Sequence, residues 1–471
     1  MTTPVSAPAR LLYDDPMRLA TEFLQQFYKS TQVQTLRFYR GEWWLYNGLC
    51  WRGADPAVLR AEVTDFIAQR HQQRAQTGDN SVAKPMSSKI VTTTLDMIQA
   101  KSVLGQEREM FSWLDDPSGR ADRNYVAFAN GILDIPAFLA GKPEAFQPPT
   151  AKWFSSSVLD YPFDPDAKCP RWVQFLDEVL GQDDQDAPLL IQEIFGYCIV
   201  PDTSFHKFFI MNGEGRNGKS TAIAVLEGLV GEKNVSHLSL ESFGDPFLPS
   251  MTVGKLVNTM TEIVKLPPAV EGKFKAFVGG EPFPVQRKFV NPVDTYPTAR
   301  CVFATNSLPA VRDHSAGFWE RLVLIPFRRF ISEENRDTTL AQTLRKELPG
   351  IALWALKGLE RLRLQNKFTI PQASREALGQ YKSESNPLGT WVSETYEFAL
   401  DAEMPVKTVG ELFDCTERMD DPTLPKPSLA QIKSEIQRAF PQCKFVRKMS
   451  QDLTEGRKKM DFVRHLRERQ Q

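Results

Sequence analysis

Residues 208–221 restrict the fold of this chain more than any other segment. They read Phe-Phe-Ile-Met-Asn-Gly-Glu-Gly-Arg-Asn-Gly-Lys-Ser-Thr, which predicts an apolar strand, a glycine-rich loop and the start of a helix. Gly213 and Gly218 enclose four residues and are followed at once by a lysine and a serine, as in the phosphate-loop pattern G-x-x-x-x-G-K-[ST]. The alternative is an irregular structural loop. The apolar residues on both sides favour the phosphate loop and an α/β fold.

The composition of the loop follows from the chemistry of phosphate binding. Glycines let backbone N–H groups close around phosphate oxygens, and the next helix presents its positive end. Lys219 supplies a positive charge, and the Ser220 hydroxyl can ligate Mg²⁺. We therefore expect ATP and Mg²⁺ as cofactors. The predicted binding residues are Gly213, Glu214, Gly215, Arg216, Asn217, Gly218, Lys219, Ser220 and Thr221.

Bulk properties exclude several classes of protein. The chain has 471 residues, of which 42% are hydrophobic and 24% charged, with a net charge of −1. No apolar run approaches the length of a membrane-spanning helix, and the first residues lack the form of a signal peptide. We expect a cytoplasmic protein with no membrane partner. Six widely spaced cysteines without a C-x-x-C pair argue against a zinc ribbon or disulfide framework and favour buried, reduced thiols.

Pattern changes along the chain predict five segments. A mixed α/β N-terminal domain precedes a helical collar, a phosphate-loop ATPase domain, a further helical segment and a C-terminal domain. Their expected boundaries are 1–165, 166–203, 204–335, 336–385 and 386–471. The first segment contains an aromatic cluster that could stack nucleic-acid bases or form the core of a small sheet. Its members are Trp43, Trp44, Tyr46 and Trp51.

The C-terminal domain could be a DNA-binding winged helix. Apolar residues recur at helical spacing over 429–440, as expected of a recognition helix, and a strand is predicted at 444–446. The competing interpretation is a helix that packs on a small core. Residues 444–471 carry nine Lys or Arg against four Asp or Glu. That excess indicates either phosphate contacts or a solvated helix face or tail.

Polar side chains stand at the ends of three further apolar segments. Glu262 ends the segment 255–261, where an acid could bind the Mg²⁺ shell or orient the attacking water. Asn306 ends 300–305, where an amide could hold water near the γ-phosphate. Arg321 precedes the last apolar strand and could stabilise charge on a neighbour's nucleotide.

Residues 130–335 resemble the helicase module of phage and plasmid primase-helicases, which are superfamily 3 helicases within the AAA+ ATPases. The order and spacing of short motifs carry the resemblance. These are Asn130-Gly-Ile-Leu-Asp, Phe195-Gly-Tyr, the phosphate loop, Thr261-Glu, Phe274-Lys, Val278-Gly-Gly-Glu, Phe303-Ala-Thr-Asn-Ser-Leu-Pro, Phe318-Trp-Glu-Arg-Leu and Ile325-Pro-Phe.

The resemblance implies a role for each matching residue. Lys219 and Ser220 would bind phosphate and Mg²⁺, Glu262 would be the catalytic and metal-binding acid, and Asn306 would be the polar sensor. Arg321 would act on the adjacent subunit of a ring, usually a hexamer.

The same resemblance implies contact with DNA. Lys288, with Arg287, would lie on a hairpin in a central pore and follow one DNA strand. The implied activity is ATP-driven translocation on single-stranded or forked DNA, in the replication of a phage, plasmid or mobile element.

Two departures and one absence qualify the match. Ile263 follows Glu262 where relatives often have a second carboxylate, and Glu320 precedes Arg321 where they often have a second arginine. No cysteine cluster or paired-Asp motif predicts a primase domain, so we expect any primase to be a separate chain.

Two other classes of function compete with the helicase. A phosphate-loop kinase would explain Lys219 but would leave Asn306, Arg321 and the basic hairpin without a role. A nucleotide-switched loader or initiator would bind DNA without unwinding it. Strand displacement separates the helicase from the loader, and DNA-stimulated ATP hydrolysis separates both from the kinase.

Overall fold

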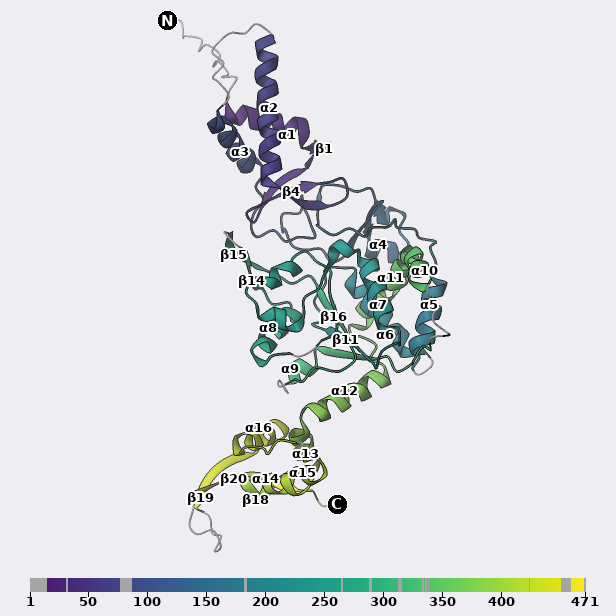
Figure 1. Ribbon diagram of the computed structural model, residues 1–471, viewed down its shortest axis with the longest axis vertical. Helices are drawn as coiled ribbons and strands as arrows, with labels where there is room; N and C mark the ends of the chain where they lie inside the picture. Colours follow the sequence, from purple (N-terminus) through teal and green to yellow (C-terminus); the bar gives the residue numbers. More distant parts are fainter. Residues whose placement is uncertain are drawn as a thin grey trace. The chain divides into compact units, whose positions relative to one another are not determined.

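The computed structural model describes residues 15–30, 33–76, 87–181, 184–263, 266–287, 290–311, 316–332, 334, 337, 339–422, 424–449 and 459–469. The chain divides into two compact units (Figure 1). One comprises residues 1–309 and 320–373, and the other comprises residues 310–319 and 374–471.

A parallel five-stranded sheet forms the centre of the first unit. Its strand order is β12-β13-β16-β11-β17. The bounds are β11 (Phe208–Asn212), β12 (Val235–Ser236), β13 (Val257–Thr261), β16 (Arg300–Thr305) and β17 (Leu322–Pro326). The phosphate-loop strand therefore lies between β16 and β17, and the strands predicted before Glu262, before Asn306 and after Arg321 are confirmed.

Both faces of this sheet are covered, which explains the unbroken apolar run of β11. Successive side chains point to opposite faces. Phe208 contacts Phe274 of α8 (Pro268–Val278), with ring centroids 5.0 Å apart. Phe209 lies in the main core together with side chains of α6 (Asp186–Cys198), α7 (Lys219–Val230) and α11 (Leu348–Gln365).

Helices α6 and α11 are packed backbone to backbone. A methyl group at Gly196 would lie 2.3 Å from the Ala355 carbonyl oxygen, and one at Gly358 would lie 2.2 Å from the Gln192 carbonyl oxygen. Because neither position has room for a side chain, two glycines set the distance between these helices.

The N-terminal part of the first unit joins three helices to a small antiparallel sheet of order β3-β4-β5. Trp51 is fully buried and Trp43 is 7% exposed, so these two aromatic residues belong to cores, as the sheet interpretation predicted. The elements are α1 (Pro16–Phe27), α2 (Pro56–Gln76), α3 (Ser88–Ser102), β3 (Leu36–Tyr39), β4 (Glu42–Tyr46) and β5 (Trp51–Ala54). A second antiparallel sheet follows, with β7 (Tyr125–Phe128), β8 (Gly131–Asp134) and β9 (Phe146–Gln147).

The second unit pairs helices with an antiparallel sheet of order β18-β20-β19 around its own core. Its elements are α13 (Pro387–Thr395), β18 (Tyr396–Pro405), α14 (Val406–Cys415), α16 (Leu429–Ala439), β19 (Lys444–Met449) and β20 (Lys459–Glu468). The helix and strand predicted over 429–446 are confirmed. A capping box between Ser428 and Gln431 fixes the start of α16.

Two properties predicted from the sequence can be compared with the described residues. Within those ranges, every helix is too short or too polar to cross a bilayer. All six cysteines are free thiols, and five are buried, with Cys415 exposed.

Candidate nucleotide site at the sheet edge

The phosphate loop turns at glycines that the geometry requires. Gly218 has φ +92°, a conformation that side chains disfavour. Gly213 has no room for a side chain, because a methyl group there would lie 2.2 Å from the Phe327 carbonyl oxygen. The loop thus holds a sharp turn directly before the N-terminus of α7.

The Lys219 ammonium group is held by oxygen atoms from three residues. It donates to the Gly213 carbonyl oxygen, to Asn217 Oδ1 at 3.0 Å and to Asn306 Oδ1 at 3.2 Å. Asn217 in turn donates from Nδ2 to the Phe327 carbonyl oxygen at 2.8 Å. Only neutral groups make these contacts, so the positive charge of Lys219 stays available to an anionic ligand.

Burial lowers the pKa of the Lys219 ammonium below its ordinary value of 10.5. The side chain is 5% exposed, whereas Ser220, the predicted Mg²⁺ ligand, is exposed. A polar loop with a buried cation, an exposed hydroxyl and a helix N-terminus fits a nucleotide triphosphate with its metal ion.

Glu262 and Asn306 lie at the same edge of the sheet as this loop. In β-sheet register, Asn212 pairs with Thr305, and Thr261 pairs with Ala304. The structure thus brings together the carboxyl ends of β11, β13 and β16, which carry the loop, the acid and the amide.

Glu262 adopts an unusual backbone conformation. Its φ is +91°, and its N–H donates to the Ala304 carbonyl oxygen at 2.8 Å. A positive φ is strained for glutamate, and strain of this kind gathers at functional sites. The side chain is exposed. This signal comes from the backbone and could not be seen in the sequence.

Arg321 lies at the opposite edge of the sheet. Phe208 pairs with Leu322 and Asn212 with Pro326, so Arg321 aligns with the start of β11, about 20 Å from the loop at a rise of about 3.3 Å per residue. A methyl group at Gly279 would be 3.6 Å from Arg321 Nη2, so the guanidinium group lies beside the end of α8. Arg321 therefore cannot reach the phosphate loop of its own chain.

The predicted hairpin is present. Strand β14 (Phe283–Arg287) pairs with β15 (Val290–Thr295) in antiparallel fashion. Lys288 lies outside the described residues, as does the side chain of Arg287. Their roles stay predictions.

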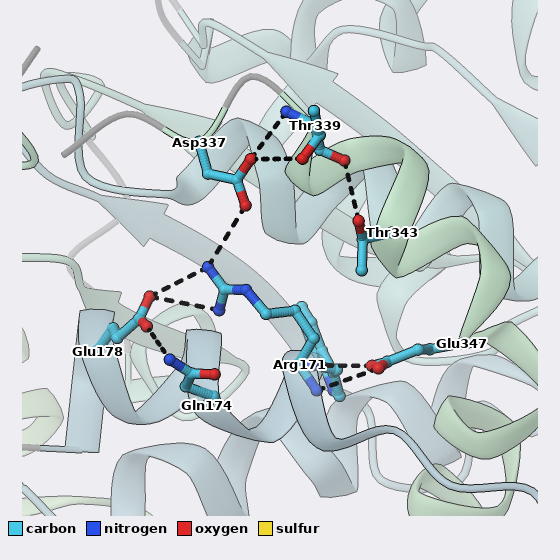
Figure 2. Close-up of polar contacts among 8 residues, drawn as sticks. Arg171, Gln174, Glu178, Asp337, Thr339, Thr343 and Glu347 are labelled. Carbon is cyan, nitrogen blue, oxygen red and sulfur yellow. Dashed lines mark hydrogen bonds and ion pairs between the residues drawn. The ribbon is translucent and has the colours of Figure 1, made fainter. Parts of the chain in front are cut away.

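The helical collar packs directly behind the phosphate loop. A methyl group at Gly218 would touch Phe175 of α5 (Pro170–Leu176) at 3.0 Å. Figure 2 shows how α5 is fixed: the Glu347 carboxylate accepts from the backbone N–H groups of Arg171 and Trp172 at 3.1 and 2.9 Å. The Arg171 guanidinium extends toward Glu178 and Asp337.

The sequence did not predict this collar contact. A carboxylate that caps a helix N-terminus is a recognised pattern, but Glu347 lies more than 170 residues beyond that helix. No local signal could have joined the two.

The basic C-terminal segment forms strands, so the expectation of a helix face is wrong for 444–449 and 459–468. Several of its cations are ion-paired. Glu403 contacts both Lys448 and Arg464, and Glu397 contacts Arg467 at 2.7 Å. The local excess of positive charge is therefore partly neutralised.

The fold and the site define a phosphate-loop protein with a mixed α/β architecture. Residues 23–181 match the family model described as D5 N terminal like, and residues 211–321 match a family of unknown function (DUF5906). These matches and the relatives below confirm the resemblance to phage and plasmid primase-helicases.

Among the relatives are two viral proteins. The chain is 22% identical to "Putative helicase 121R" of Invertebrate iridescent virus 3, over 61% of this chain and 34% of that protein. It is 22% identical to "Putative helicase L207/L206" of Acanthamoeba polyphaga mimivirus, over 72% and 36%. The chain thus spans about a third of the length of these curated relatives.

A solved structure shares the fold. The apo C-terminal region of NrS-1 aligns with a TM-score of 0.53 at 12% identity, covering 96% of this chain and 99% of that one.

Proposed function

We propose that this chain is an ATP-dependent DNA helicase of superfamily 3, built on an AAA+ ATPase core. It would assemble as a ring, with a hexamer expected, and translocate on single-stranded DNA during replication of a phage, plasmid or mobile element. The observation that carries the proposal is the division of predicted catalytic residues between two sheet edges. Lys219 and Asn306 meet at one edge, and Arg321 lies at the other.

The site residues divide the work of hydrolysis. Lys219 would bind the phosphates, while Ser220 and Glu262 would hold the Mg²⁺ ion, which supplies charge neutralisation when bound. Glu262 would also orient the attacking water, and Asn306 would fix that water by hydrogen bonding. Arg321 would complete the site of a neighbouring subunit.

DNA contacts would come from two places. Arg287 and Lys288 would follow a strand from the hairpin. The second unit would add a winged-helix contact, because α16 is followed by β19 and β20 of the three-stranded sheet and presents exposed Ser434 and Gln437. Changing both residues to alanine should weaken binding to forked DNA without altering ATP hydrolysis in the absence of DNA.

The experiment that tests the proposal is displacement of a labelled strand from a forked duplex with ATP and Mg²⁺. The Lys219→Ala protein serves as the matched control, because it loses one charge at the phosphate site. Displacement by the wild type alone supports a motor. DNA binding and DNA-stimulated ATP hydrolysis without displacement would favour the loader, and hydrolysis that DNA does not stimulate would favour the kinase class.

A further inference from the structure

A cavity lies at the sheet edge opposite the phosphate loop, between the N-terminal sheet and the β14–β15 hairpin. Its volume is about 430 Å³, within the range of about 300 to 1,000 Å³ typical of small-ligand sites. It is lined by aromatic and apolar side chains together with three arginines and two glutamates, Glu42 and Glu109. Those used below are Tyr39, Trp44, Tyr296, Arg40, Arg120 and Arg123.

Arg40 occupies a backbone position that does not favour arginine. It forms the two-residue turn between β3 and β4 with Gly41, and both have positive φ, +50° and +82°. Turns of this type prefer Asn, Asp or Gly. An arginine kept in a conformation that disfavours it indicates that its side chain has a use.

The Arg40 side chain is held in place by neutral groups. Nη1 donates to Thr295 Oγ1 at 2.9 Å, Nε and Nη2 donate to the Gln106 carbonyl oxygen, and the guanidinium carbon lies 5.0 Å from the centre of the Tyr39 ring. Within the described ranges, no carboxylate lies within ion-pair distance of Arg40. The guanidinium group is thus positioned by hydrogen bonds to neutral groups, and it contacts the last residue of β15.

Two further arginines stand at the rim with donors to spare. Arg120 Nη1 is 2.8 Å from Glu109 Oε1, and Arg123 Nη1 is 2.9 Å from Asp202 Oδ1. A guanidinium group has five N–H donors, so one carboxylate contact fixes it and leaves others available. Tyr296 presents a half-exposed ring at the same cavity.

We propose that this cavity binds a nucleobase together with its phosphate, as one nucleotide of a single DNA strand. The base would stack on Trp44 and Tyr296, and Arg40 would contact the phosphate. Because Arg40 touches the end of β15, the bound nucleotide would lie at the base of the hairpin that is predicted to follow DNA. The choice of a DNA strand rests on the proposed function. A free mononucleotide has the same chemistry and is distinguished in the test.

The test measures binding of a fluorescent oligo-dT single strand to the full chain without ATP. The first variant is Arg40→Asn, because asparagine suits this turn and should preserve folding. Its affinity should fall several-fold, and the slope of log affinity against log salt should flatten by about 0.7, as expected for one lost phosphate contact. The second variant, Tyr296→Leu, changes a half-exposed residue and should weaken binding about tenfold.

The matched control is Arg60→Asn. Arg60 also donates to a threonine hydroxyl, Thr92 Oγ1 at 3.1 Å, but it lies on α2 and does not line the cavity. The affinity of the Arg60→Asn variant for oligo-dT should equal that of the wild type. A strand carrying bromodeoxyuridine should photocrosslink to peptides that contain Tyr296 or Trp44, and Arg40→Asn should reduce these crosslinks.

Three outcomes separate the possibilities. Unchanged affinity and crosslinks in both variants, with unwinding intact in the wild type, would overturn this inference alone. Binding of dTMP that is lost in Arg40→Asn, without any effect on strand binding, would assign the cavity to a free mononucleotide. A wild type that binds neither strand nor dTMP and hydrolyses no ATP would overturn both the inference and the proposed function.

Discussion

Lys219 Nζ and Asn306 Oδ1 lie 3.2 Å apart, although 87 residues separate them in the chain. The contact exists because β16 pairs directly with β11, so the residue after one strand meets the helix that follows the other. An amide at this point can accept from the lysine in the absence of ligand and can position water beside a bound phosphate.

Replacing Asn306 with alanine should separate binding from turnover. We expect Asn306→Ala to retain ATP affinity within a few-fold and to lower kcat about 10²-fold, as for loss of one preorganised polar group. Phosphate release and ATP titration measure the two quantities. Asn130→Ala is the control, because Asn130 bonds to the Phe163 backbone away from the loop. Full turnover in Asn306→Ala would rule out a sensor role.

As pH rises, ATP affinity should begin to fall at a lower pH than it would if the lysine at the phosphate loop had its ordinary pKa. Burial lowers the pKa of Lys219, so the folded protein loses this proton at a lower pH than the unfolded chain does. Below the pKa of Lys219 in the folded protein, burial of the charged ammonium lowers the free energy of unfolding. The free energy of unfolding rises again as pH increases from that pKa toward 10.5. Titrations with ATP from pH 7 to 10 measure the decline. Lys219→Arg, which stays charged, should remove it.

Arg321→Ala should leave ATP binding intact and suppress hydrolysis by about 10³-fold or more if it serves a neighbouring subunit. Mixing Arg321→Ala with Lys219→Ala chains should restore part of the activity, since some interfaces then contain both intact halves. Each variant alone is the control. If the mixtures hydrolyse ATP no faster than either variant alone, the two chains do not share a site.

Substitutions at Glu262 can separate the backbone strain at this position from the role of its carboxylate in ATP hydrolysis. Glu262→Gly and Glu262→Ala both remove the carboxylate and should both abolish hydrolysis. Glycine accepts a φ of +91° and alanine does not, so Glu262→Gly should be more stable by about 1 kcal/mol. Denaturant unfolding provides the comparison, with Glu262→Gln testing the carboxylate alone. Equal stability of the glycine and alanine variants would mean that the conformation is unstrained.

Gly358→Ala should lower stability by about 1–3 kcal/mol, because the added methyl would lie 2.2 Å from the Gln192 carbonyl oxygen. The control is Gly272→Ala in α8, where no atom lies within 4 Å of the added methyl. There alanine should raise stability by up to about 1 kcal/mol through its helix propensity. Thermal unfolding of the two variants should therefore shift in opposite directions.

The strand–loop–helix at 208–221 was predictable because local rules determine it. An apolar run, two glycines and a lysine permit few other structures. The side chains after β13 and β16 were predictable for a related reason, since parallel strands place their carboxyl ends at one edge. The sequence patterns therefore predicted that Glu262 and Asn306 lie at the same edge of the sheet.

Other features depend on contacts between distant segments. Glu347 caps α5 from the turn between α10 (Leu340–Lys346) and α11, and Gly196 contacts α11 only because α6 packs there. The basic residues of β19 and β20 looked free in the sequence, but some are paired with acids from β18. Composition counts charges, and only the fold shows which of them are neutralised.

The sheet separates the phosphate loop and Arg321 by its own length. In the proposed ring, one chain's arginine would serve the next chain's nucleotide, so each contact would join two different surfaces. Such a contact is head-to-tail and repeats from chain to chain. The angle between neighbours alone then decides whether the assembly closes on itself or continues as an open helix.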